Sequence, residues 1–208
     1  MDKKIKFPQK HAAKQQKILK ATRKLLAQKG AQKLSAAAIA HELGWTTPGL
    51  YYYYPNLQTI IDEVLKQLIQ ESFDATWEAA KLGTNGLQGL IFAFEARIQH
   101  YLNHPEDFDL TWNQFADQEV SQELLTEFLY PKAQAFSQWL AQWLEEEKTT
   151  GRVGQKVDCR KLVNLMIALV QGILSFYLTF DRVGGQMRYS VDEMIAEGRR
   201  TLLAALKD

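Results

Sequence analysis

The sequence predicts an all-helical protein, and three observations support this fold class. Apolar residues recur at intervals of three and four, whereas the alternation typical of β-strands is missing. Residues with strong capping preferences stand where helices are expected to begin and end. A content of 46% hydrophobic and 24% charged residues is typical of folded globular proteins. The length of 208 residues fits one large domain or two small ones.

The N-terminal quarter of the chain predicts three helices. They cover residues 10–29, 36–43 and 47–53. The first helix ends at Gly30, a residue that readily adopts the left-handed conformation found after helices. Ser35 is a favourable N-cap for the second helix, which ends at Gly44. The third helix stops before Pro55, because a residue that precedes proline disfavours helical geometry.

The remainder of the chain predicts a longer series of helices. The first is a long helix capped by Asn56. The next four cover residues 87–103, about 107–117, 121–149 and 158–182, and the last helix starts at Ser190. The segment Lys81–Gly89 contains three glycines and predicts a break. Pro105 ends the helix before it, and Pro131 predicts a kink or a break within the stretch 121–149. Ser190 and Glu193 have the spacing of a capping box.

Two short helices joined by a glycine turn form a helix-turn-helix pattern over residues 35–54. Trp45 and Leu50 flank a Thr46 cap and form a hydrophobic staple that fixes where the next helix begins. Several short polar or aromatic residues are then left on the outward face: Thr47, Pro48, Gly49, Tyr52 and Tyr53. Such groups at a helix N-terminus suit the major groove of DNA and its phosphates.

The net charge of +1 hides an asymmetry along the chain. Residues 1–54 carry ten Lys and one Arg against two acidic residues, a net +9, and residues 55–208 have a net charge of −8. A basic head on an acidic body favours a partner that is a polyanion, although an ordinary solvated lysine face would look similar. The lysines at positions 3, 4, 6 and 10 are expected either to form a DNA-binding arm or to be a disordered tail.

A set of residues between about positions 14 and 65 follows one family pattern without a gap. These residues are Ile18, Ala21, Leu25, Gly30, Ser35, Ile39, Ala40, Gly44, Thr46, Gly49, Leu50, Tyr51, Tyr54, Asn56 and Ile60. In them the chain resembles the tetracycline-repressor (TetR) family of bacterial transcription regulators. The resemblance implies a three-helix DNA-binding head, a larger helical body that senses a ligand, and a homodimer formed through the last two helices. We accordingly expect a DNA-binding domain at 1–55 and a ligand-binding and dimerisation domain at 56–208.

The resemblance also implies which residues contact DNA. They are Ser35, Thr46, Thr47, Pro48, Gly49, Tyr51, Tyr52 and Tyr53. Tyr51 and Tyr53 correspond to phosphate contacts, whereas Thr47, Pro48 and Tyr52 correspond to contacts with base edges. Helical spacing leaves an alternative open, in which Tyr54 and also Tyr51 pack inward.

One residue departs from the family pattern. The family usually has a lysine that binds a phosphate at the start of the fourth helix, and this sequence has Leu57. The missing charge is expected to weaken that contact, although backbone N–H groups at the helix start could still bind the phosphate.

Large aromatic residues are frequent in the predicted body. Most are expected in the core, and some are expected to line a ligand pocket. The predicted pocket residues are Phe94, Glu95, Ile98, Trp112, Phe115 and Trp139. Glu95 lies on an apolar stripe, where it is expected to be a buried carboxylate that accepts a cationic or hydroxyl-bearing ligand. Alternatively, it lies at the edge of the stripe and reaches water.

The segment 162–180 is uncharged over 19 residues, near the length of a membrane span. Its polar residues Asn164, Gln171 and Ser175 favour instead a buried helix or the seam of a dimer. The dimer is expected to use the apolar stripes of the last two helices. These comprise Leu162, Met166, Leu169, Ile173, Tyr177, Val191, Ile195, Leu202 and Leu206.

No common enzyme motif is present in the sequence, neither a phosphate-binding glycine loop, nor a di-iron Glu-x-x-His pair, nor a nucleophile elbow. The protein is therefore predicted not to be an enzyme and to need no cofactor. The single Cys159 excludes an internal disulfide and a zinc site made only of thiolates. His100 and His104 have a spacing that can hold a metal, but Pro105 ends their helix, and no metal site is predicted. Because the N-terminus has no apolar signal region, a cytoplasmic location is expected.

The sequence therefore predicts a homodimeric transcriptional regulator that binds double-stranded DNA and responds to a small molecule. The simplest version is a repressor that an apolar or aromatic molecule releases from a palindromic operator. A first alternative is a helical ligand-binding protein that has lost specific DNA binding, for which Leu57 is the best support. A second is a membrane-associated bundle, which depends on the segment 162–180.

Overall fold

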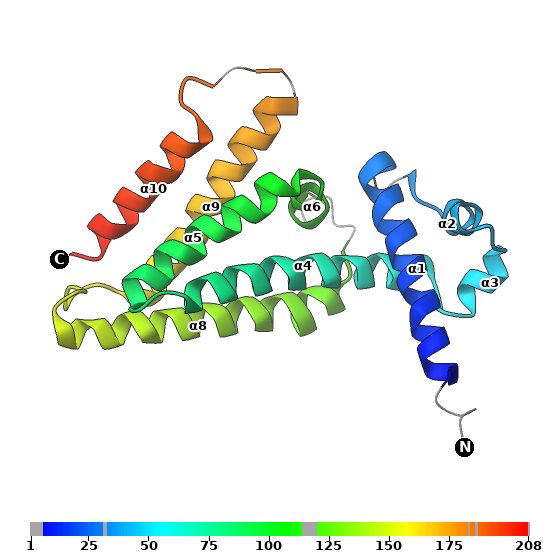
Figure 1. Ribbon diagram of the computed structural model, residues 1–208, viewed down its shortest axis with the longest axis horizontal. Coiled ribbons are helices and arrows are strands. Elements are labelled where there is room, and N and C mark those ends of the chain that lie inside the picture. Colours follow the sequence, from blue (N-terminus) through cyan, green and yellow to red (C-terminus); the bar gives the residue numbers. More distant parts are fainter. Residues whose placement is uncertain (1–5, 31–32, 114–119, 183, 186, 208) are drawn as a thin grey trace. The chain divides into compact units, whose positions relative to one another are not determined.

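The computed structural model describes residues 6–30, 33–113, 120–182, 184–185 and 187–207. Within these residues every regular element is a helix, which confirms the predicted all-helical class (Figure 1). The α-helices are α1 (Lys6–Lys29), α2 (Ala36–Leu43), α3 (Thr47–Tyr51), α4 (Leu57–Lys81), α5 (Gly86–Asn103), α6 (Pro105–Phe108), α8 (Tyr130–Glu146), α9 (Cys159–Arg182) and α10 (Val191–Ala205). Short π-helical segments cover Asp109–Asn113 and Leu124–Leu129, and a 3-10 helix covers Glu147–Thr150.

The chain forms two compact units that share helix α4. The first unit contains the described residues up to Ile69 together with those of the segment 106–129. The second contains residues 70–105 and the described residues from Tyr130 onward. The predicted functional division into residues 1–55 and 56–208 does not coincide with these units, and it stays a prediction.

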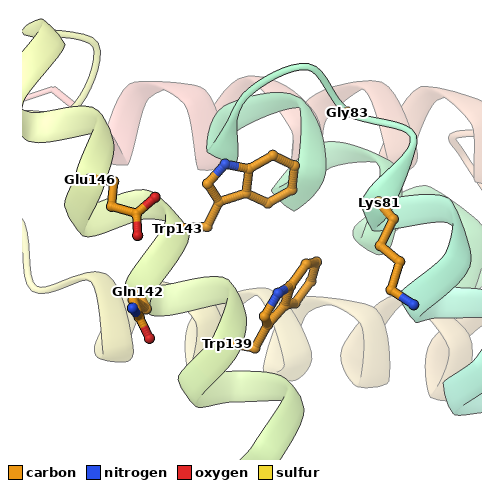
Figure 2. Close-up of a pocket in the computed structure, with 6 residues that line it drawn as sticks. All are labelled: Lys81, Gly83, Trp139, Gln142, Trp143 and Glu146. Atoms are coloured by element: carbon orange, nitrogen blue, oxygen red, sulfur yellow. The ribbon is translucent and has the colours of Figure 1, made fainter.

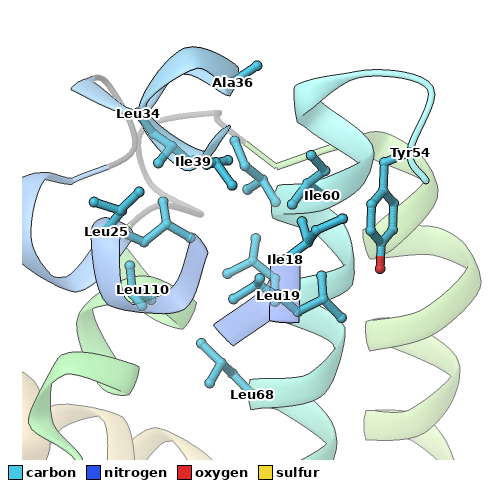
Figure 3. Packing of buried hydrophobic residues seen from close by; sticks show 14 of the residues in the cluster. Ile18, Leu19, Leu25, Leu34, Ala36, Ile39, Tyr54, Ile60, Leu68 and Leu110 are labelled. Carbon is cyan, nitrogen blue, oxygen red and sulfur yellow. The ribbon is translucent and has the colours of Figure 1, made fainter. Parts of the chain in front are cut away.

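The first unit is built around an apolar cluster that α1, α2 and the first part of α4 supply (Figure 3). Ile18, Ile39 and Ile60, one from each of these helices, are fully buried in it. Leu110 and Leu124 from the later segment pack into the same cluster. The core of the predicted DNA-binding head is thus completed by residues far beyond it in the sequence.

Helix α9 packs against α5, α8 and α10 in the second unit. A row of aromatic rings joins the end of α4 to α8: Phe73 and Trp77 both contact Phe136, and Trp77 also contacts Trp139. On another side of α5, Phe94 lies directly over Gly198 of α10, where an added Cβ would come within 2.5 Å of the ring. The apolar stripes predicted from spacing therefore form the interior of a helical bundle.

Most predicted helix boundaries are confirmed to within a few residues. Gly30 and Gly44 have positive φ angles, and Ser190 and Glu193 form the expected capping box. His104 is the C-cap of α5, directly before Pro105. Pro131 lies in the first turn of α8, where its missing N–H costs little, and the wider π-helical segment Leu124–Leu129 precedes it.

Candidate nucleic-acid and ligand sites

The turn between α2 and α3 is fixed by local hydrogen bonds. The Ser35 hydroxyl accepts a hydrogen bond from the Ala38 N–H at 3.1 Å and so caps α2. Gly44 ends that helix with φ 67° and ψ 31°, a left-handed conformation that a residue with a Cβ adopts only at a cost. Its N–H points back to the carbonyl oxygens of Ala40 and His41. Both caps predicted from the sequence are confirmed.

Helix α3 is only five residues long and depends on its cap and on one buried side chain. The Thr46 hydroxyl accepts a hydrogen bond from the Gly49 N–H at 3.2 Å. An added Cβ at position 49 would also lie 3.2 Å from that hydroxyl, so glycine leaves room for the cap. Leu50 is fully buried in the core of the first unit. These contacts leave Thr47 and Pro48 on the outer side of the helix, half-buried and exposed respectively.

The four consecutive tyrosines have different environments. Tyr52 is the most exposed, at 73%, and Tyr51 is 43% exposed. Tyr54 is buried, and this burial together with the Glu63 carboxylate raises its pKa to about 12. The inward packing of Tyr54 is therefore confirmed, whereas the alternative that Tyr51 packs inward is wrong.

Tyr53 is half-buried and belongs to an aromatic cluster beside α3. Its ring centroid lies 5.7 Å from that of Trp45 and 4.8 Å from that of His11 on α1. The Lys14 Nζ lies over both rings, 5.5 Å from the centre of Trp45 and 5.9 Å from that of Tyr53. A hollow of about 340 Å³ is lined by Lys14, Trp45, Thr46, Gly49, Tyr52 and Tyr53. A lysine and the start of α3 thus face one concave surface, a combination that suits a phosphate.

Leu57 occupies the first position of α4, where the family resemblance predicts a lysine. Its side chain is half-buried against the apolar cluster of the first unit. The preceding Asn56 caps the helix, because its Oδ1 accepts hydrogen bonds from the Thr59 N–H at 2.8 Å and the Thr59 hydroxyl at 3.0 Å. The start of α4 is therefore well formed without a charged side chain at this position.

The N-terminal helices match a known family model. Residues 18–64 match the family model described as bacterial regulatory proteins, tetR family. This segment therefore resembles the regulatory domain of that family. The matched segment contains all of α2 and α3 together with parts of α1 and α4, which are the elements described above.

Solved structures of several regulators have the same fold over nearly the whole chain. A TetR-family regulator from Marinobacter aquaeolei VT8 has a TM-score of 0.70 at 18% identity, with coverage of 97% of this chain and 100% of that one. The ketosteroid transcriptional regulator KstR2 of Mycobacterium tuberculosis has a TM-score of 0.68 at 15% identity, covering 94% and 95%. The fatty acid degradation regulator FadR from Bacillus halodurans has a TM-score of 0.70 at 16% identity, covering 91% and 94%. A search of curated proteins gives no match.

The predicted ligand residues do not gather in one place within the described chain. Phe94 and Ile98 are fully buried in the second unit, whereas Trp112 belongs to the first. Phe115 lies outside the described residues. Trp139 and Glu95 line two different hollows of the second unit. As a set, these residues stay a prediction.

The prediction that Glu95 is a buried carboxylate without a partner is wrong. Its Oε1 accepts a hydrogen bond from the Arg199 Nε on α10 at 2.6 Å, and the carboxylate is partly exposed. Helix α5 places Glu95 beside the buried stripe and toward α10. The pair joins residues 104 positions apart, which local spacing could not reveal.

Trp139 lines an open hollow of about 360 Å³ at one end of the second unit (Figure 2). Trp143, one turn further along α8, lies beside it with the two ring centroids 5.6 Å apart. Lys81 and Gly83 line the facing side, and Gln142 and Glu146 lie on α8. The Trp143 ring packs directly against Gly89, because an added Cβ at that glycine would come within 2.5 Å of the ring. This surface can accept a flat apolar molecule.

Sequence reasoning missed Arg97, the charged residue that the second unit buries most deeply among those described. It lies on α5 with only 6% exposure. The signal was present in the spacing, because Arg97 follows the buried Phe94 by three residues and precedes the buried Tyr101 by four. Glu95 lies off that stripe, which explains why it reaches α10 and water instead.

The residues predicted to form the dimer interface are largely core residues of a single chain, and this part of the prediction is wrong. Six of them are buried within the second unit: Leu162, Met166, Ile173, Ile195, Leu202 and Leu206. A different face of α9 is open. It carries Asn164, Leu165, Ala168, Gly172 and Phe176, with Leu165 43% and Phe176 52% exposed. Helical spacing identifies the apolar positions of α9. It does not show which of these positions pack against other helices of the same chain.

Residues Cys159–Leu178 of α9 are apolar and long enough to cross a membrane by length and composition alone. One such helix is weak evidence, because core helices of soluble proteins meet the same criteria. Cys159 itself is buried at the start of α9, and burial raises the pKa of its thiol to about 11. This environment favours an unreactive thiol, in line with the absence of a predicted role.

Proposed function

We propose that this protein is a homodimeric regulator of the TetR family that inserts α3 into the major groove of a palindromic DNA operator. The observation that carries this proposal is the exposed outer side of α3, where Thr47, Pro48 and Tyr52 are presented beside a lysine-rich helix α1. A polyanionic duplex suits the net charge of +9 on residues 1–54.

The predicted contacts divide by their accessibility. Tyr52 projects furthest into solvent, and together with Thr47 and Pro48 it is proposed to contact base edges. Tyr51 and Tyr53 flank this group and are proposed to contact phosphates, with Lys14 supplying charge beside Tyr53. Ser35 and Thr46 act through the caps that hold α2 and α3, and their own hydroxyls accept hydrogen bonds within the chain.

Dimerisation is proposed to use the open face of α9, because it is apolar and contains small residues. Ala168 and Gly172 allow two helices to approach closely, while Leu165 and Phe176 supply apolar area. The two copies of α3 must then lie about 34–36 Å apart to enter successive major grooves on one side of the duplex.

Release from the operator is proposed to follow binding of a small apolar or aromatic molecule in the second unit. A molecule that prefers a conformation with a different spacing of the two α3 helices lowers DNA affinity by that difference in affinity. This makes the protein a repressor that its ligand inactivates.

A second candidate function is a helical ligand-binding protein without specific DNA binding. The observation that favours it is Leu57, which packs against the core where the family pattern has a lysine. The two functions differ in one measurable property, which is binding to the DNA next to the protein's own gene.

The deciding experiment is a titration of that DNA with the full-length protein at several salt concentrations. Specific binding is expected, with an observed affinity that falls steeply as salt rises because condensed counterions are released. Binding that is weak and equal for operator and unrelated DNA would support the second function and refute the first.

A further inference from the structure

The environment of Arg97 differs from that of the arginines that form ion pairs in the described chain. Arg23, Arg152, Arg199 and Arg200 are partly or largely exposed, and each forms an ion pair with a carboxylate. Arg97 is the buried one, and within the described residues no carboxylate pairs with it. Its guanidinium lies over the Phe73 ring, 4.6 Å from the centroid, and the Tyr101 side chain interacts with it electrostatically. The most costly charge to bury is thus the one without a counter-ion.

These contacts compensate the charge of Arg97 only in part. A ring face and a phenol oxygen are weak partners compared with a carboxylate, which accepts two parallel hydrogen bonds from a guanidinium. Burial lowers the pKa of Arg97 from its ordinary value, but a guanidinium stays protonated near neutral pH. A second cation lies nearby, because the Lys132 Nζ is 5.9 Å from the centre of the same Phe73 ring. Two cationic side chains therefore lie near this ring.

The surroundings of this charge are aromatic. Phe73 contacts Phe136, and Phe136 in turn contacts Trp77 and Trp139. A molecule that neutralises Arg97 must therefore combine an anionic group with an apolar body. We propose that Arg97 binds the carboxylate of an apolar carboxylic acid, which is the effector of this protein. This inference rests on the proposed function, because it names the chemical class of the small molecule that the second unit binds.

The proposal reverses the charge that the sequence suggested for the ligand. Glu95 was the expected partner of a cationic ligand, but Arg199 neutralises it within the chain. Arg97 lies two residues further along α5 and has no such neutralising partner in the described residues. An anionic ligand supplies a counter-charge for Arg97, whereas a cationic one would add to the buried positive charge.

The first test compares three probes of nearly identical shape on the full-length protein without DNA: phenylbutyrate, its methyl ester and phenylbutylamine. Binding is measured by thermal shift and by quenching of tryptophan fluorescence. We expect the carboxylate to bind at least about tenfold more tightly than the ester, since hydrogen bonds to charged groups are the strong ones. The amine should not bind measurably. Equal affinities of carboxylate and ester, or tighter binding of the amine, would overturn the proposal.

The second test changes Arg97 itself. Arg97→Met removes an unpaired buried charge, so the ligand-free variant is expected to melt at a higher temperature than the wild type and to lose its preference for the carboxylate. Arg97→Lys keeps the charge without the planar fork and should retain part of the preference. Arg160→Met, at an exposed position on α9, is the control and should keep the full preference. A lower melting temperature for Arg97→Met with the preference intact would show a structural role only. If Arg97→Met does not fold, the comparison of the three probes on the wild type decides.

Failure of this inference can be told apart from failure of the proposed function. A protein that prefers phenylbutyrate but binds no operator would refute the regulator and leave the carboxylate site standing. A protein that binds its operator and is released by the ester or the amine, but not by phenylbutyrate, would refute the carboxylate site and leave the regulator standing.

Discussion

Arg23 on α1 and Asp107 on α6 form an ion pair with an Nη2–Oδ2 distance of 2.6 Å, although 84 positions separate them. The Asp107 side chain is 1% exposed, whereas that of Arg23 is 33% exposed. Both residues belong to the first unit, and α6 follows directly after α5 in the chain. The pair therefore ties α1 to the segment that follows α5 in the chain.

Arg23→Met should destabilise the protein more than loss of a surface ion pair does, because it leaves a buried carboxylate without its cation. We expect a loss of about 2 kcal/mol, below the ~3–5 kcal/mol of fully buried pairs since Arg23 is partly exposed. Urea denaturation measures this loss. Lys24→Met breaks the exposed pair with Glu42 and is the control, with a change within about 0.5 kcal/mol. Adding Asp107→Leu to Arg23→Met should recover part of the loss, and equal losses for Arg23→Met and Lys24→Met would contradict the assignment.

Tyr53→Phe and Thr47→Ala should affect DNA binding in different ways. A phosphate contact carries no sequence information, so Tyr53→Phe is expected to weaken operator and unrelated DNA by similar factors. Thr47→Ala should instead change the preference among operator variants that differ by one base pair, by about 1–3 kcal/mol at the contacted position. Fluorescence anisotropy with labelled duplexes measures both effects. Tyr130→Phe, at an exposed tyrosine of the second unit, is the control. Identical profiles for the Tyr53 and Thr47 variants would refute the division of roles.

Ala168→Glu should prevent dimer formation, because it places a charge at the centre of the open face of α9 in each copy. Sedimentation velocity is expected to show monomers for this variant and dimers for the wild type. Ala135→Glu, at an exposed position of α8, should stay dimeric and serves as the control. An intact Ala168→Glu dimer would place the interface on another surface.

Glu147 predicts a specific dependence of stability on pH. Its carboxylate accepts hydrogen bonds from the Arg152 Nη1 at 2.5 Å and the Gly86 N–H at 3.1 Å. These interactions, the one with Arg152 foremost, hold the pKa of Glu147 below its ordinary value of 4.5. Because the folded-state pKa is the lower one, the ionised carboxylate stabilises the protein above about pH 4.5. That contribution disappears as the pH falls through the folded-state value.

Glu147→Gln should therefore be less stable than the wild type at pH 7, by about 1–2 kcal/mol, since hydrogen bonds to a charged group are lost. The difference should shrink as the pH falls below 4.5. Chemical denaturation at pH 7, 5 and 4 checks this trend. Glu78→Gln changes an exposed carboxylate that pairs with Lys81 and is the control, with a change within about 0.5 kcal/mol at each pH. A difference that grows toward acid would contradict the sign of the predicted effect.

Features that depend on a few neighbouring residues could be predicted from the sequence. The caps at Ser35, Thr46 and Ser190 are local hydrogen bonds, and each was recognisable from residue type and spacing. The same holds for the left-handed Gly44, whose conformation few other residues tolerate.

Features that depend on distant parts of the chain could not be predicted. The partner of Glu95 lies on α10, more than a hundred positions away, so a stripe position alone suggested a free carboxylate. Apolar residues occur on both faces of α9, and only packing against α5, α8 and α10 shows which of them the chain covers itself. Arg97 was overlooked because a charged residue is normally assigned to a surface, although its spacing from Phe94 and Tyr101 places it inside.

The open face of α9 affects how operator occupancy would depend on the amount of this protein in the cell. In the proposed dimer a second copy covers Leu165 and Phe176, and assembly of the active form would then be a bimolecular event. When few chains are present, the amount of that form rises with the square of their number, so doubling expression would raise operator occupancy about fourfold at low occupancy. A gene under such control would respond to small changes in regulator synthesis more sharply than a regulator active as a single chain allows.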